Sequence, residues 1–99
     1  MDIGTTIKNI RKRKGLTQGD LAIESGITQT YLSQIENNLK DPTVSTLKKI
    51  SVRLQIPLPI LFFLSIDEND IPSEKKETFQ LIGNSMKSMI NEFFSAQYA

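Results

Sequence analysis

The sequence contains neither cysteine nor histidine, and these two absences exclude several classes of function. Without cysteine the chain has no disulfide framework and no thiolate metal site, which suits a reducing compartment. Without histidine it lacks imidazole metal ligands and the commonest general base. The remaining residues form no nucleophile–base set, metal cluster or phosphate-binding loop. We therefore expect no enzyme activity, no cofactor and no bound metal.

Long apolar runs are missing as well. The longest strongly apolar stretch, 56–64, contains two prolines and is too short to span a bilayer. The basic run at 11–14 is not followed by the apolar segment of a secretory signal peptide. With 99 residues, 38% of them apolar, the chain can form one small globular domain and one appended element. These features predict a cytoplasmic protein that does not contact membranes.

The net charge of +1 conceals an asymmetry along the chain. Positions 1–64 hold nine basic and five acidic residues, whereas positions 65–99 hold three basic and six acidic ones. A basic first part can neutralise phosphates, while an acidic second part is repelled by nucleic acid. The charge pattern is consistent with nucleic-acid binding by the first part alone.

Segment 18–35 has the residue spacing of a helix-turn-helix. Ala22 is a small residue where two steeply crossing helices would touch, and Gly26 can make the tight turn at positive φ. Leu32 and Ile35 are three positions apart on one side of the second helix, where they can pack onto the first. The pattern predicts that the other side of the second helix is exposed.

That exposed side carries uncharged hydrogen-bonding side chains. Positions 29, 33 and 37 recur at intervals of four, which places them along one helix face, and position 30 flanks them. Gln and Asn can pair with adenine, and Ser or Thr can bond to base edges or phosphates. A merely solvated helix face would more often carry Glu and Lys. The predicted base-reading residues are Gln29, Thr30, Ser33 and Asn37.

Residues 7–64 resemble the phage-repressor family of DNA-binding domains, the XRE or Cro-like helix-turn-helix group. The matching stretches are 7–18, Leu21-Ala22, 26–29, 31–37 and Pro42-Thr43, followed by Leu47 and Ile50. The resemblance implies an all-α, five-helix lambda-repressor-like domain. It also implies binding to double-stranded operator DNA as a two-fold homodimer, regulation of transcription, and a bacterial or phage-encoded source.

The same resemblance implies roles for further residues. Arg11 and Glu36 match an ion pair between the first and third helices. Leu39 departs from the polar or basic residue usual in the family, and Asn38 occupies a place where the family often has glycine. The predicted phosphate contacts are Gln18, Thr28, Tyr31, Gln34, Asn38, Lys40 and Thr43.

Periodicity and capping residues place the helices. We expect helices over about 2–14, from Thr17 onward, over 28–37, from Thr43 onward, and a short one near 60–64. Asn38 is expected to adopt a left-handed conformation after the third helix. The residues of the fourth helix that we expect to face the core are Val44, Leu47, Ile50, Ser51 and Leu54.

The chain beyond the domain divides into a polar linker, 65–73, and a C-terminal helix, 74–99. Apolar residues there follow spacings of three and four, which is typical of a helix–helix contact over two heptads. The helix can fold back onto its own domain or pair with a second copy, and we favour pairing because operator binding usually needs two half-sites. The predicted dimerisation residues are Phe79, Ile82, Met86, Met89, Ile90 and Phe93.

The sequence thus predicts a sequence-specific transcriptional regulator, most simply a repressor, with a DNA-binding domain over 1–64. About 35 residues remain after that domain, too few for a ligand-sensing domain, so no small-molecule ligand is expected. Two alternatives keep the fold: a restriction–modification controller, or the antitoxin of a toxin pair. A third is a protein-interaction module that does not bind DNA.

Overall fold

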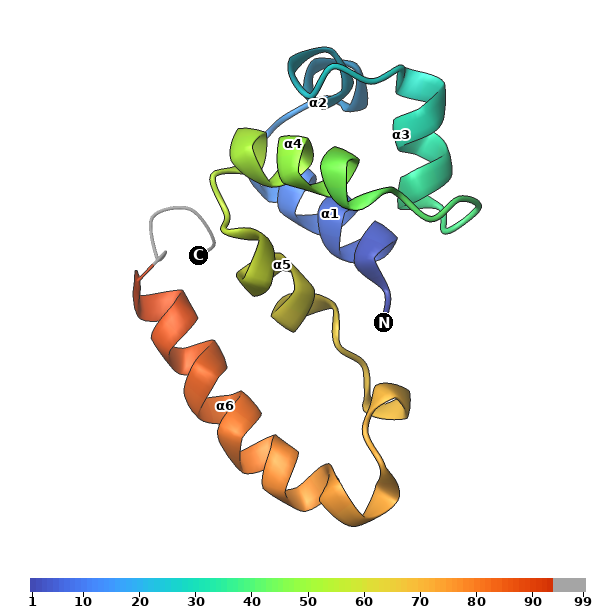
Figure 1. Ribbon diagram of the computed structural model, residues 1–99. Helices are drawn as coiled ribbons and strands as arrows, with labels where there is room; N and C mark the ends of the chain where they lie inside the picture. Colours follow the sequence, from blue (N-terminus) through green and yellow to red (C-terminus); the bar gives the residue numbers. More distant parts are fainter. Residues whose placement is uncertain (94–99) are drawn as a thin grey trace. The chain divides into compact units, whose positions relative to one another are not determined.

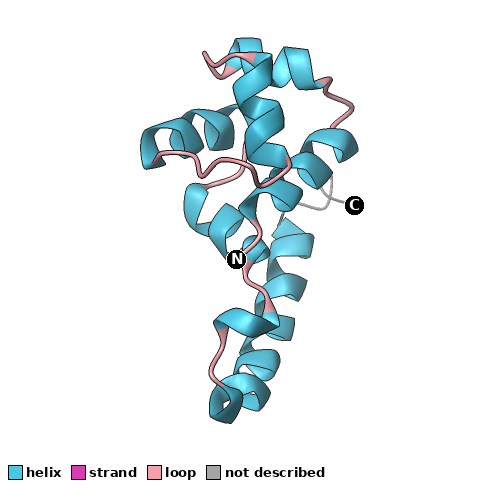
Figure 2. Ribbon diagram, turned by 90° about the vertical axis from the view of Figure 1, so that its right-hand side faces the viewer, coloured by secondary structure: helices cyan, strands magenta, loops and turns pink. Residues whose placement is uncertain are grey.

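The computed structural model describes residues 1–93, with side chains up to Glu92, and these residues form helices joined by short loops (Figure 1). The helices are α1 (Ile3–Arg13), α2 (Gln18–Glu24), α3 (Gln29–Glu36), α4 (Val44–Leu54), α5 (Leu58–Ser65) and α6 (Lys76–Phe93), with 3-10 turns η1 (Glu68–Asp70) and η2 (Ser73–Lys75). Within residues 1–93 there is no strand (Figure 2). The predicted all-α class, with five helices and one more at the C-terminal end, is confirmed.

The chain separates into two compact units. The first covers Asp2–Ile66 and contains α1 to α5. The second begins at Asp67, includes Met1, and contains α6. The boundary therefore falls just after α5.

Side-chain caps start each of the first four helices. The carboxylate of Asp2 accepts a hydrogen bond from the Thr5 backbone N–H and so caps α1. The hydroxyls of Thr17, Thr28 and Thr43 cap α2, α3 and α4 by accepting from backbone N–H groups three residues later, at 3.0–3.1 Å. Each bond satisfies a donor that has no partner inside the helix. The helix starts predicted from these threonines are confirmed.

The turn between α2 and α3 depends on Gly26. Its φ is +69°, a conformation that residues with a side chain rarely adopt. The Ile27 backbone N–H donates to the carbonyl of Ala22 at 3.0 Å, which closes the turn. Ala22 itself is 1% exposed, as expected for a small residue where two helices touch. The turn and crossing predicted from the spacing are present.

All five helices contribute to one apolar core. Its fully buried large side chains are Ile7, Leu21, Leu32, Ile35, Ile50, Leu54, Ile56 and Leu61. One prediction is wrong: Val44, expected in the core, is 59% exposed. Val44 is the first residue of α4, and helical periodicity gives the side on which a residue lies but not how far the neighbouring helices extend along it. The other α4 residues predicted to face inward are buried.

In the second unit, η1 is closed by a reciprocal capping box between Asp67 and Asp70. Helix α6 is amphipathic, and Leu81, Ile82 and Met89 on it are 69%, 54% and 62% exposed. Of the helices within residues 1–93, none is both long and apolar enough to cross a membrane.

Candidate nucleic-acid interface

Helix α3 has two chemically distinct sides. Leu32 and Ile35 are completely buried and fix the helix against the core. Gln29, Thr30 and Asn37 are exposed on the surface. Of the four predicted base-reading residues only Ser33 is half-buried, and its hydroxyl accepts a hydrogen bond from the Asn37 amide at 3.4 Å. The exposed side of α3 therefore presents uncharged donors and acceptors.

A buried ion pair anchors α3 to α1. Arg11 Nε donates to Glu36 Oε2 at 2.8 Å, and Arg11 Nη2 donates to Glu36 Oε1 at 3.0 Å. The third donor, Arg11 Nη1, reaches the carbonyl oxygen of Leu16 at 2.9 Å. The two side chains are 10% and 1% exposed. Such a two-bond geometry fixes orientation as well as charge, so the pair sets how α3 lies on the domain.

The ion pair continues through Gln18 toward the surface. Gln18 Nε2 donates to Glu36 Oε1 at 3.2 Å, which directs Gln18 Oε1 outward. Gln29 Nε2 then donates to Gln18 Oε1 at 3.5 Å, which is longer than the other hydrogen bonds that connect these side chains. We call these four residues, Arg11, Glu36, Gln18 and Gln29, the Arg11–Gln29 network.

The network leaves Gln29 with a free acceptor, its Oε1, and a second N–H on Nε2. An adjacent donor and acceptor on one side chain match the N6 and N7 edge of adenine. Sequence reasoning placed Gln29 and Gln18 on neighbouring helices but did not foresee the bond from Gln18 to Glu36.

The residues predicted to contact phosphates lie at helix starts and in the loop after α3. Thr28, Asn38, Lys40 and Thr43 are exposed, whereas Gln18, Tyr31 and Gln34 are half-buried. The carbonyl of Gln34 accepts from the backbone N–H groups of Leu39 and Lys40, at 2.8 and 3.3 Å. The first-turn N–H groups of α4, from Val44 and Ser45, have no partner inside the helix. Donors for anions are thus available at the start of α4.

Asn38 has the predicted left-handed conformation, with φ +58°, and its side chain forms a bond that the sequence did not suggest. Its Nδ2 donates to Asp2 Oδ1 at 2.8 Å. The backbone N–H of Thr5, and after it the Asn38 amide, hold the pKa of the Asp2 carboxyl below its ordinary value of 3.8. No sequence signal links positions so far apart.

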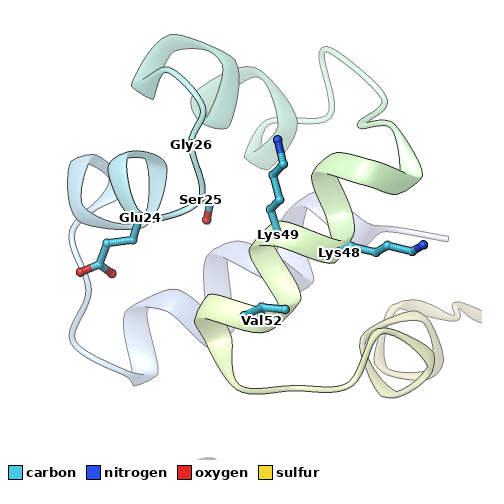
Figure 3. A pocket seen from close by; sticks show the side chains of 6 residues that line it. All are labelled: Glu24, Ser25, Gly26, Lys48, Lys49 and Val52. Atoms are coloured by element: carbon cyan, nitrogen blue, oxygen red, sulfur yellow. The ribbon is translucent and has the colours of Figure 1, made fainter.

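A different surface lies between the turn after α2 and helix α4. Glu24 and Arg53 form a partly exposed ion pair there. A shallow hollow of about 440 Å³ is lined by Glu24, Ser25, Gly26, Lys48, Lys49 and Val52 (Figure 3). Burial, and then the nearby charge of Arg53, lower the pKa of Lys14 at the end of α1. None of the residues predicted to contact DNA lines this hollow.

Two helices joined by a tight glycine turn, with the second helix buried on one side and polar on the other, define a helix-turn-helix domain. The family model described as helix-turn-helix matches residues 7–61. The chain belongs to this family, in its XRE-type branch of phage and bacterial regulators.

Several relatives of known name are transcriptional regulators. The chain is 46% identical to the HTH-type transcriptional regulator SlrR of Bacillus subtilis over 61 residues, which are 61% of this chain and 40% of SlrR. It is 40% identical to SinR of the same organism over 60 residues, 60% of this chain and 54% of SinR. The immunity repressor of Bacillus phage phi105 is 39% identical over 56 residues, 57% of this chain and 39% of the repressor. The match thus spans about half or less of these relatives' lengths.

Solved structures of the same fold include a DNA complex. SinR, a master regulator for biofilm formation, in complex with DNA matches with a TM-score of 0.58 and 39% identity, over 61% of this chain and 97% of that one. A point mutant of the restriction–modification controller C.Esp1396I matches with a TM-score of 0.62 and 36% identity, over 68% of this chain and 87% of the controller chain. A chain of the complex of SinR with SinI matches with a TM-score of 0.61 and 33% identity, over 96% of this chain and 93% of that one. The lambda-repressor-like class of the first unit is confirmed.

Proposed function

We propose that this protein is a sequence-specific transcriptional repressor that binds a two-fold operator as a homodimer, with α3 in the major groove. The observation that carries the proposal is the polar side of α3, where exposed Gln29, Thr30 and Asn37 and half-buried Ser33 stand in place of the charged residues of an ordinary solvated helix. Gln and Asn can pair with adenine in the major groove, and Ser or Thr can bond to several base edges.

Phosphate contacts supply most of the affinity in this proposal. Lys40 adds charge near the end of α3, and the starts of α2, α3 and α4 offer backbone N–H groups suited to anions. Asn38 keeps a second amide hydrogen after its bond to Asp2. Because each neutralised phosphate releases counterions, binding will weaken steeply with salt.

Helix α6 is the proposed dimerisation element. Exposed apolar residues on one helix usually mark a contact with another protein surface. Ile82 and Met89 belong to the predicted contact, and both are more than half exposed. Of the other predicted contact residues, Phe79 and Met86 are half-buried and Ile90 is only 7% exposed, so Ile90 does not fit an exposed contact. The side chain of Phe93 lies outside the described residues. Binding to two half-sites one helical turn of DNA apart requires the two α3 helices of the pair to lie about 34 Å apart.

A restriction–modification controller is the second candidate function. It is favoured by the likeness to C.Esp1396I, whose chain is covered to 87%. That candidate keeps the DNA-binding surface and the pairing of two copies, and it differs only in the genes controlled. The likeness to SinR in its complex with SinI, which extends over 96% of this chain, favours instead a protein partner for the same fold. An antitoxin, or a module that binds only protein, would belong to this last group.

Selection of bound fragments from random-sequence DNA tests the proposal. The full chain should enrich a sequence with two-fold symmetry and half-sites about 10 base pairs apart. A single enriched half-site would refute the dimer while keeping the DNA-binding role. No enrichment at low salt, where phosphate contacts are strongest, would leave only the protein-interaction function.

A further inference from the structure

We propose that Asp2 is a positioning residue for DNA binding, because it holds the loop after α3, residues 38–43, in the conformation that contacts phosphates. It acts through Asn38. This inference rests on the proposed function, since it concerns how the phosphate-contacting loop is held. Asp2 does not itself face DNA in this proposal.

Asp2 is held in place by bonds other than the one to Asn38. The Asp2 backbone N–H donates to the carbonyl of Ser65 at 2.9 Å, which ties this residue to the end of α5. The Asp2 carbonyl accepts from Thr6 Oγ1 at 3.0 Å, and its carboxylate caps α1 through Thr5. A side chain held in this way transmits the position of α1 to its partner Asn38.

Asn38 in turn is fixed at the point where α3 ends. Its backbone N–H donates to Ile35 O at 3.0 Å, and its side chain donates to Asp2 at 2.8 Å. The bond to a carboxylate is charge-assisted, so it is stronger than a bond between neutral groups. The residue that turns the chain out of α3 is therefore bonded on both sides.

Gly4 shows how closely α1 approaches this turn. A Cβ at position 4 would overlap the carbonyl oxygen of Ile35 and the side-chain oxygen of Asn38. The absence of a side chain at Gly4 thus lets the start of α1 lie directly against the end of α3. This contact brings Asp2 within reach of Asn38.

The loop cannot hold itself in place with its own backbone alone. The backbone N–H groups of Leu39 and Lys40 both donate to Gln34 O, so they are used inside the turn. From Asp41 onward, no backbone hydrogen bond is made until the cap of α4 at Thr43. The fixed points of the loop are therefore Asn38 at its start and Thr43 at its end. Losing the Asp2 bond leaves the first of them held only by the Asn38 backbone bond to Ile35.

Two substitutions remove the bond in different ways. Asn38→Gly deletes the amide, and glycine adopts positive φ without strain. Asp2→Ser keeps a side-chain oxygen that can cap α1, but it removes the carboxylate that Asn38 reaches. The matched control is Gln55→Gly, which makes the same kind of change at the other described non-glycine residue with positive φ, at the end of α4.

We expect each variant to weaken binding to the selected operator and to random duplex DNA equally, by about three- to tenfold. The operator-to-random ratio should stay unchanged, because the loop contacts phosphates rather than bases. The double variant should bind no more weakly than Asn38→Gly alone, since that variant already removes the bond through which Asp2 acts. Gln55→Gly should bind as the wild type does.

Two measurements on the free protein show whether the bond holds the loop. In Asn38→Gly the NMR-measured pKa of Asp2 should rise, and hydrogen exchange at the Leu39 and Lys40 amides should become faster. If that pKa rises while DNA binding of both variants matches the wild type, the positioning role is refuted. If neither the pKa nor the exchange changes, the bond does not hold the loop and the proposal also fails.

Failure of the proposed function has a different signature. A wild-type chain that binds no DNA at low salt refutes the function, and with it any role of Asp2 in DNA binding. If hydrogen exchange at the Leu39 and Lys40 amides is nevertheless faster in Asn38→Gly, the bond holds the loop but has no role in DNA binding.

Discussion

The two units of the molecule differ in what they bury, although both expose apolar side chains, among them Ile23, Leu39 and Val52 in the first. In Asp2–Ile66, five short helices bury a common core and an internal ion pair, and the α3 surface is left polar. From Asp67 onward there is one long helix, on which Leu81, Ile82 and Met89 are largely exposed. The first unit has the parts of an independently folded domain, whereas the second presents apolar surface of the kind that usually contacts a partner.

We assign the two units different tasks in the proposed function, DNA reading to the first and self-association to the second. A unit that buries its own core can hold side chains rigidly enough to read DNA. In the proposed dimer, α6 contributes through association instead, and its effect depends on protein concentration. Substitutions should therefore change stability in the first unit and assembly in the second.

The largest effect is expected at the buried ion pair. Glu36→Ala leaves Arg11 buried without its partner, which should lower the free energy of unfolding by about 3–5 kcal/mol. Replacing both by apolar residues, Arg11→Met with Glu36→Leu, should cost less than Glu36→Ala alone. Urea denaturation at fixed protein concentration measures both values.

The exposed pair of Glu24 with Arg53 is the matched control for that experiment. Because these side chains are 44% and 34% exposed, Glu24→Ala should cost less than about 1 kcal/mol. Equal losses at Glu24 and Glu36 would contradict the structural role given to the buried pair.

The second effect should appear in assembly rather than in stability. Ile82→Asp places a charge on the apolar side of α6 and should weaken self-association on the order of a hundredfold. Asn84→Asp adds the same charge away from the predicted contact and should leave association unchanged. Sedimentation equilibrium over a range of concentrations distinguishes them. A wild-type chain that sediments as a monomer throughout would show that α6 does not pair with its copy.

The smallest effect concerns pH. The pKa of Asp2 is below 3.8 in the folded protein, so its carboxylate stabilises the fold at higher pH. This contribution should be fully present well above pH 3.8 and should be lost as the pH falls through the lower, folded pKa. The difference in unfolding free energy between wild type and Asp2→Asn should shrink over that range. A difference that is constant with pH would mean that Asp2 makes no stabilising charged contact.

Much of the fold could be predicted because its signals are local. Each of these signals depends on residues only a few positions apart. They are a threonine before a helix, a glycine between two helices, and apolar residues three or four positions apart. Val44 marks the limit of such reasoning. Its spacing fits the buried side of α4, but burial also depends on how far the neighbouring helices extend along α4, and Val44 is 59% exposed.

The candidate site could be predicted only in its outline. The sequence indicates which residues of α3 are exposed, since that follows from the helical period. The bonds that orient them join positions far apart, as from Gln18 to Glu36 and from Asp2 to Asn38. Such bonds depend on how α1, α2 and α3 are packed, and no local pattern encodes them.

The most direct test of the central claim compares Gln29→Ala with Gln80→Ala, the same change on α3 and on an exposed position of α6. Competition binding gives the affinity of each full-length variant for the selected operator and for random duplex DNA. Gln29→Ala should lower the operator-to-random ratio by about tenfold or more, with little change in random-DNA affinity, and Gln80→Ala should change neither. If Gln29→Ala weakens binding to both DNAs equally, or to neither, α3 does not read the operator through Gln29.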